Sequence, residues 1–148
     1  MSELKQRITE DMKCAMRARD KQRLGTIRLV LSELKRIEVD ERIELDDARI
    51  LVVMDKMLKQ RRESIKQFLS AGRQDLVDIE AAEVIVIQEY MPAALSEEEI
   101  DQFVQQAMAA VGAASMKDMG AIMAQLKPKL QGRADMAKVS QRVKQQLT

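Results

Sequence analysis

The stretch DDARILVVMDKMLKQRRESIKQFLSAG, residues 46–72, predicts the fold of this chain. Apolar side chains recur in it at steps of three and four residues, which is the spacing of one face of an α-helix. Asp46 or Asp47 can cap the start of this helix, and Gly72 can stop its end. At 1.5 Å per residue the helix is about 38 Å long. We expect an all-α protein with this helix as its spine. The predicted core stripe consists of Ile50, Val53, Met54, Met57, Leu58, Ile65, Phe68 and Leu69, with Arg61 as its polar interruption.

Shorter helical patterns lie on both sides of the long helix. Before it, one apolar stripe runs from Leu4 to Met16, and a second consists of Leu24, Ile27, Leu31 and Leu34. The charged segment 39–44 breaks the period and is expected to be a connection. After the long helix we expect one helix over residues 74–90, ended by Pro92, and three short helices over residues 96–111, 115–128 and 135–147.

These patterns predict a multihelical all-α protein in two subdomains. Residues 1–92 would form a group of about four helices, and residues 93–148 a small unit of three helices. The boundary is placed near Pro92, directly before Ser96 and Glu99, which have the spacing of a helix capping box. At about fifty-five residues, the second unit is expected to depend on the first for part of its stability.

The composition is that of a folded protein in a reducing compartment. Of the 148 residues, 46% are hydrophobic and 33% charged, which excludes a disordered chain. The single cysteine, Cys14, cannot form an intramolecular disulfide. The N-terminus lacks the apolar core of a secretory signal, and no apolar run is long enough to span a membrane. We therefore expect a cytoplasmic protein with no membrane partner.

The sequence lacks the residues of the common catalytic sites. Histidine is absent, which excludes Ser-His-Asp and Cys-His arrangements. The glycines form no phosphate-binding loop, and Cys14 is expected to be a packing residue. The carboxylates between Asp75 and Glu89 have spacings that could hold Mg²⁺ or Ca²⁺, but a solvated face or ion pairs with a neighbouring helix are the favoured interpretation. No catalytic residue, metal or cofactor is predicted.

The charge is distributed unevenly along the chain. Residues 1–72 carry a net charge of +4, residues 73–101 carry −8, and residues 112–148 carry +5. The cations of the long helix are diluted by acidic residues, so an ordinary solvated helix is the favoured interpretation there. A basic C-terminal cluster could instead contact phosphates and is the predicted RNA-binding site. It consists of Lys127, Lys129, Arg133, Lys138, Arg142 and Lys144.

An ordered set of short motifs gives the chain a family resemblance. The set is Tyr90-Met91-Pro92, Leu95-Ser96-Glu97-Glu98-Glu99-Ile100, Lys117-Asp118-Met119-Gly120, Leu126-Lys127-Pro128 and Gly132-Arg133-Ala134-Asp135, together with Lys59-Gln60-Arg61-Arg62-Glu63-Ser64. In this order the motifs resemble the YqeY family. That family is similar to the tail domain of the B subunit of the tRNA-dependent amidotransferases (GatB). The family usually has glycine after the aspartate of the Gly-Arg-Ala-Asp turn, where this chain has Met136.

The resemblance implies an all-helical, non-catalytic module that binds tRNA or structured RNA near aminoacyl-tRNA metabolism. Two alternatives stay open at this point. The chain could be an adaptor that docks a translation-related protein through its acidic 73–101 segment or its long helix. It could also be an accessory component of a carbon–nitrogen ligase that uses glutamine as amido donor, with the chemistry in other subunits.

Overall fold

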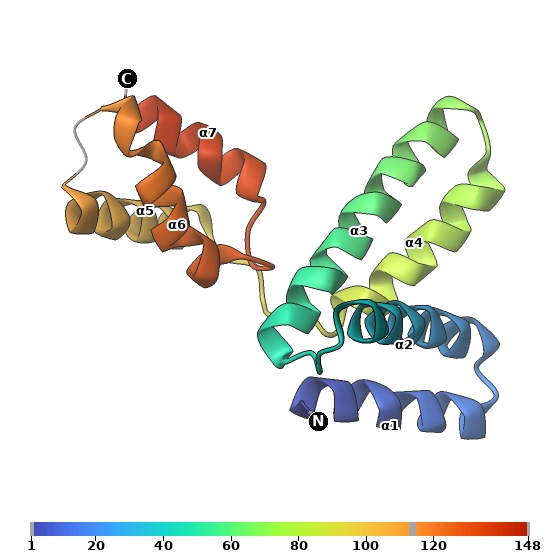
Figure 1. Cartoon of the computed structure of the whole chain (residues 1–148). Coiled ribbons are helices and arrows are strands. Elements are labelled where there is room, and N and C mark those ends of the chain that lie inside the picture. The colour runs from blue at the N-terminus through green and yellow to red at the C-terminus, as the bar shows by residue number, and fades with distance from the viewer. Residues whose placement is uncertain (1, 113–114, 148) are drawn as a thin grey trace. The chain divides into compact units, whose positions relative to one another are not determined.

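The structure is a computed structural model that describes residues 2–112 and 115–147. Within these ranges it contains seven α-helices and one short 3₁₀ helix, and no β-strand (Figure 1). The all-α multihelical prediction is confirmed. Contacts along the chain divide it into two compact units, Met1–Met91 and Pro92–Thr148, and each unit is described by itself.

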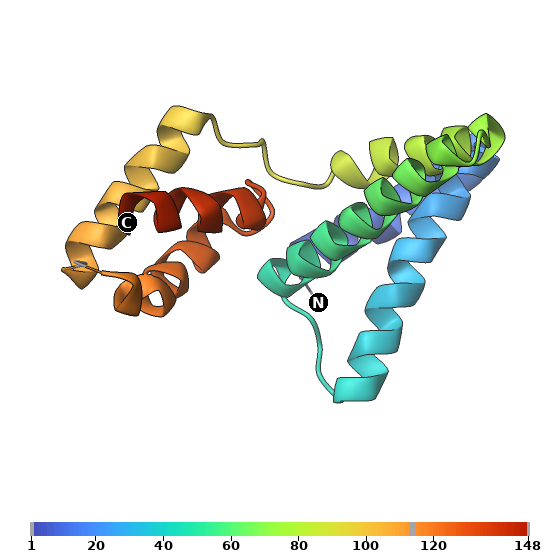
Figure 2. The same cartoon turned by 90° about the horizontal axis from the view of Figure 1, so that it is seen from above.

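The first unit consists of two antiparallel helix pairs (Figures 1 and 2). The pair α1 (Glu3–Ala18) and α2 (Lys21–Glu41) packs across one end of the pair α3 (Asp47–Ser70) and α4 (Gln74–Gln88). The core lies where the two pairs meet, since the fully buried side chains come from all four helices. They include Ile8, Ile27, Leu34, Ile50, Met54, Leu58 and Ile87.

Side-chain caps fix where the helices of this unit begin. The hydroxyl of Ser2 accepts a hydrogen bond from the Lys5 amide (3.0 Å), and the carboxylate of Asp46 accepts one from the Arg49 amide (2.8 Å). Each cap satisfies an amide that has no partner inside its own helix. Gly72 adopts a left-handed φ of 69° directly after α3, as the sequence predicts.

The structure corrects three boundary and packing predictions in this unit. The helix α2 continues into segment 39–44 and ends at Glu41. The next residue, Arg42, adopts a left-handed φ of 56° although it is not glycine. Leu69, placed in the core stripe of the long helix, is 56% exposed. Met16, placed in the stripe of the first helix, is 49% exposed. Both lie on helix flanks that no third helix covers, which periodicity alone does not reveal.

The second unit consists of α5 (Glu97–Val111), a 3₁₀ helix (Met116–Asp118), α6 (Met119–Leu130) and α7 (Met136–Leu147). Its core consists of apolar residues from all three α-helices, among them Val104, Ile122, Leu126 and Val143. Ser96 and Glu99 form the predicted capping box at the start of α5. The expected end of a helix at Pro128 is wrong, because α6 continues through this proline to Leu130. Leu130 is fully buried, so packing holds the last turn in place although proline donates no hydrogen bond there.

Candidate functional site

The structure separates the six predicted RNA-binding cations into two groups. Lys127 and Lys129 on α6 and Lys138 and Lys144 on α7 are exposed. Arg133 and Arg142 are instead half-buried and engaged within the unit. The predicted cluster is therefore four solvated lysines beside two structural arginines. The contact of these six residues with RNA stays a prediction.

The two arginines tie α7 and the Gly132 turn to the start of the unit. Arg142 donates to the carboxylate of Asp101 (2.8 Å) and to the backbone carbonyl of Glu97 (3.0 Å), both on α5. Arg133 donates to the carbonyl of Ala93 (3.4 Å). The carboxylate of Asp101 offsets the charge of Arg142, whereas the Ala93 carbonyl orients Arg133 without neutralising it.

The carboxylates between Asp75 and Glu89 are mostly paired with polar neighbours. Glu83 accepts a hydrogen bond from Arg61 of α3 (2.7 Å), with both side chains mostly buried. Asp75 accepts two hydrogen bonds from Arg73, and this pairing lowers the pKa of the Asp75 carboxyl. The polar interruption in the long apolar stripe is thus half of an ion pair between α3 and α4.

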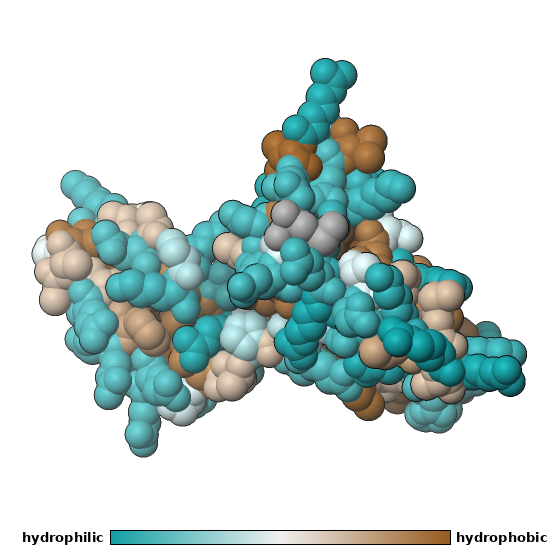
Figure 3. Space-filling model, turned by 90° about the horizontal axis from the view of Figure 1, so that it is seen from below, coloured by the Kyte–Doolittle hydropathy of each residue, from teal (hydrophilic) through white to brown (hydrophobic). Residues whose placement is uncertain are grey.

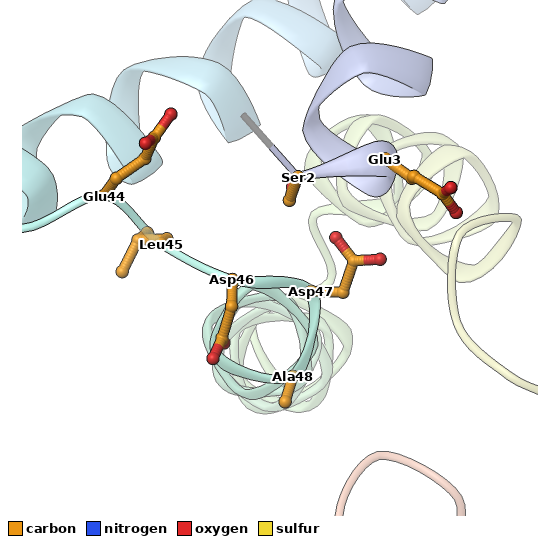
Figure 4. Close-up of a pocket in the computed structure, with 7 residues that line it drawn as sticks. All are labelled: Ser2, Glu3, Glu44, Leu45, Asp46, Asp47 and Ala48. Carbon is orange, nitrogen blue, oxygen red and sulfur yellow. The ribbon is translucent and has the colours of Figure 1, made fainter.

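An open hollow of about 600 Å³ lies where the N-terminal ends of α1 and α3 meet (Figure 4). It is lined by Ser2, Glu3, Glu44, Leu45, Asp46, Asp47 and Ala48. Three of its polar groups bind the backbone: Asp47 accepts from the Leu4 amide (3.2 Å), and Ser2 and Asp46 cap their own helices. The hollow is therefore a joint between two helix N-termini.

A polar cluster at the end of α4 fixes the α1–α2 pair to the rest of the first unit. The Tyr90 hydroxyl donates to the carboxylate of Asp11 on α1 (2.6 Å), and Arg23 on α2 donates to the carboxylate of Glu89 (2.7 Å). The guanidinium of Arg7 lies over the Tyr90 ring, 4.9 Å from its centre. Burial of Tyr90, together with its bond to Asp11, raises the pKa of the phenol. The cluster therefore joins α1 and α2 to the end of α4.

The opposite side of the α1–α2 pair carries a row of cations. At 100° per residue, Arg28 lies about 140° around α2 from the inward-facing Arg23. Lys21, Arg28 and Lys35 follow one another at seven-residue steps along this side, and all three are exposed. Leu24 and Leu31 alternate with them and are partly buried. We call this surface the basic face; it consists of Lys13, Lys21, Arg28, Lys35, Met16, Leu24 and Leu31.

The carboxylates near the basic face are all engaged by other groups. Glu10 pairs with Arg17, Glu38 with Lys5, and Asp40 with Arg36. Asp20 caps the Arg23 amide (3.1 Å). Within residues 2–112 and 115–147, no hydrogen bond or ion pair joins the side chains of the face's four cations to another group. The face therefore presents four uncompensated positive charges around a shallow apolar strip.

The sequence contained a signal for this face that the apolar stripe concealed. Leu24, Ile27, Leu31 and Leu34 were expected to form one stripe on the second helix. In the structure Ile27 and Leu34 are fully buried in the core, whereas Leu24 and Leu31 lie toward the α1 side and are only partly buried. In the sequence, the cations and the leucines of this helix each repeat every seven residues. This repeat indicates a second apolar strip beside the one that faces the core.

Two further surface features bear on the site. Cys14, expected to be a packing residue, is a free and exposed cysteine. The surface drawn in Figure 3 is mostly hydrophilic, with its hydrophobic side chains in small separate groups.

In the described part of the chain, none of the helices has the length and apolar character that crossing a membrane requires.

Comparison with known proteins finds similar fungal proteins with one name, "Altered inheritance of mitochondria protein 41, mitochondrial", among them those of three species. The protein of Kluyveromyces lactis is 39% identical over 97 residues, which are 64% of this chain and 52% of the relative. That of Saccharomyces cerevisiae is 36% identical over 104 residues, 68% and 56% of the two chains. That of Pyrenophora tritici-repentis is 30% identical over 143 residues, 94% and 78% of the two chains. The chain thus spans about half the length of the two yeast relatives.

These names correct two expectations drawn from the sequence. The cytoplasmic location is contradicted, because the relatives are named as mitochondrial proteins. The tRNA- or structured-RNA-binding function is contradicted as well, together with the translation adaptor and the ligase component, because the relatives are named for the inheritance of mitochondria. The similarity to the amidotransferase tail stays a prediction.

The family itself is settled by a match over nearly the whole chain. The sequence profile described as "Yqey-like protein" matches residues 5–147 and therefore includes all seven α-helices from the third residue of α1 onward. This chain belongs to the YqeY-like family.

Proposed function

We propose that this chain is a non-enzymatic binding module that works through its basic face, in a process related to the one its relatives are named for. The observation that carries the proposal is the set of four exposed cations without a compensating carboxylate. Carboxylates neutralise other cations on the surface of this unit, as Glu33 and Asp40 do for Arg36. An uncompensated row of this kind attracts and orients a negatively charged partner.

The polar groups with unusual surroundings also favour binding over catalysis. The Tyr90 cluster, the Arg61–Glu83 pair and the capping residues of the hollow each join helices to one another. Each of these groups has a structural partner, whereas a general acid–base site requires an acid or base that is available to a substrate. We therefore place the binding surface on the exposed side of the helices.

The proposal can be tested in Kluyveromyces lactis cells that lack the relative. Because the chain spans about half of that protein, it is expressed with the relative's own flanking segments. The fraction of daughter cells that inherit mitochondria is scored for the parent sequence and for Arg28→Glu/Lys35→Glu. We expect the parent to restore inheritance and the variant to fail.

A matched control separates the basic face from general charge. Lys66→Glu/Lys117→Glu changes the net charge by the same amount at two exposed lysines outside the face. This control should restore inheritance as the parent does. If the two double variants restore it equally, the basic face is not the working surface and the proposal is wrong.

A further inference from the structure

We infer that the partner of the basic face is an acidic amphipathic α-helix of another protein, lying along this face. This inference rests on the proposed function and names the chemistry of its partner. It is carried by the spacing of the cations, the partly buried leucines beside them, and the exposed Met16.

The cation spacing matches the repeat of a helix. Lys21, Arg28 and Lys35 are seven residues apart, so their Cα atoms follow one another at about 10.5 Å along α2. An α-helix that carries Glu or Asp every seventh residue presents carboxylates at the same interval. Three such pairs would extend over about 21 Å, or four turns, of both helices. This is the charge pattern by which helices choose a partner and an orientation in coiled coils.

The apolar part of the face is less exposed than its cations and adjoins the core of the unit. Leu24 and Leu31 are partly buried, while the cations around them are exposed. The ion pair of Lys5 with Glu38 sets α1 antiparallel to α2 with residues 5 and 38 level with each other. In this register Met12 lies level with Leu31, and the 49% exposed Met16 lies near Arg28. The strip therefore runs between two helices, as in helix-in-groove recognition.

The same geometry argues against a flat anionic surface. A bilayer rewards large, exposed apolar side chains beside the charged groups, whereas Leu24 and Leu31 are partly buried. Single-stranded nucleic acids are bound with aromatic stacking that this face cannot offer, since none of its seven residues is aromatic. A helix with an apolar ridge and acidic flanks uses both the strip and the cations.

The test uses a labelled 21-residue peptide of three heptads, with Leu at positions a and d and Glu at e and g. The glutamates repel one another between copies, so the peptide does not pair with itself. Fluorescence anisotropy measures its binding to the full chain at low and at high salt. We expect binding that weakens with salt, with a Kd raised at least tenfold by Arg28→Glu/Lys35→Glu and unchanged by Lys66→Glu/Lys117→Glu.

Two further arms separate charge from apolar contact. A peptide with Lys in place of Glu should bind the Arg28→Glu/Lys35→Glu variant better than the parent chain. Met16→Ala should weaken binding of the Glu peptide severalfold, while Met116→Ala, at an equally exposed methionine of the second unit, should not. Vesicles of phosphatidylglycerol serve as the competing anionic surface.

The outcomes decide between the inference and the proposed function. If the Glu peptide does not bind even at low salt, or if the vesicles bind with the same dependence on Arg28 and Lys35 while the peptide does not, the acidic-helix partner is wrong. The proposed function then still stands if the inheritance assay depends on the basic face. If that assay is also independent of the face, both are wrong.

Discussion

The ion pair of Arg61 and Glu83 should contribute strongly to the stability of the first unit. The two groups are 2.7 Å apart, and their side chains are only 14% and 18% exposed. Removal of one partner of a fully buried pair costs about 3–5 kcal/mol, because the other charge is left without compensation. Since these side chains keep some contact with water, we expect Arg61→Met or Glu83→Leu alone to cost about 2–3 kcal/mol.

The double variant Arg61→Met/Glu83→Leu should recover most of this loss. It leaves no uncompensated charge and places two apolar side chains in an apolar seam, a replacement that is often neutral. We expect it to lie within about 1 kcal/mol of the parent chain, which corresponds to a coupling energy of about 3 kcal/mol or more.

The chain provides a specific probe for this measurement. Tyr90 is its only tyrosine, there is no tryptophan, and Tyr90 is buried in the first unit. Tyrosine fluorescence during urea unfolding therefore reports on that unit alone, even if the two units unfold separately. The reasoning would be refuted if each single variant cost under about 0.5 kcal/mol, the range of exposed pairs, or if the double variant cost the sum of the two.

Three further predictions concern the same unit. The bond from Lys5 and the amide of Leu45 lower the pKa of Glu38, so its contribution to stability is present above the unfolded pKa of about 4.3 and is lost as pH falls through the lower folded value. Urea titrations at pH 6 and pH 3 should accordingly show that Glu38→Gln destabilises at the first pH and much less at the second; an equal effect at both would contradict this. Asp11→Asn removes the charged acceptor of the Tyr90 hydroxyl and should cost about 1–2 kcal/mol by tyrosine fluorescence, whereas Asp40→Asn, in an exposed pair, should cost under about 0.5 kcal/mol. Arg42 has a left-handed φ, which glycine adopts more easily, so Arg42→Gly should raise the free energy of unfolding by up to about 1 kcal/mol. The control Lys35→Gly, within α2, should lower it instead.

The sequence predicts the helices well because each start and stop has a local cause. Ser96 with Glu99, Gly72 and Gly112 act through hydrogen bonds and backbone angles of their immediate neighbours, so residue type and spacing suffice. The two misplaced ends have distant causes. Pro128 is tolerated because Leu130 is anchored in a core built by other helices. The helix α2 extends into the charged segment as far as Glu41, next to the turn in which Glu38 is held by Lys5 of α1.

The candidate site was harder to predict than the fold. Charge counting pointed to the C-terminal cations, yet Arg133 and Arg142 are used inside their own unit. Whether a cation is free depends on carboxylates and carbonyls that lie about forty positions away in the chain. On α2, Arg23 and Arg28 look alike in sequence, but only Arg23 pairs with Glu89, directly after α4. The difference between a structural arginine and an exposed one is thus a tertiary property.

The way in which α3 and α4 are partnered implies a gradient of stability along both helices. The core of the first unit takes its α3 and α4 residues from the end near Ile50, Leu58 and Ile87. Toward the Gly72 turn the buried Val77 belongs to neither core cluster, and Leu69 and Ile79 are more than half exposed. Amide hydrogens near the turn should therefore exchange through local openings long before those at the other end, which open only with the whole unit. Although the backbone of the helix pair is continuous, its two ends therefore differ in the free energy needed to open them.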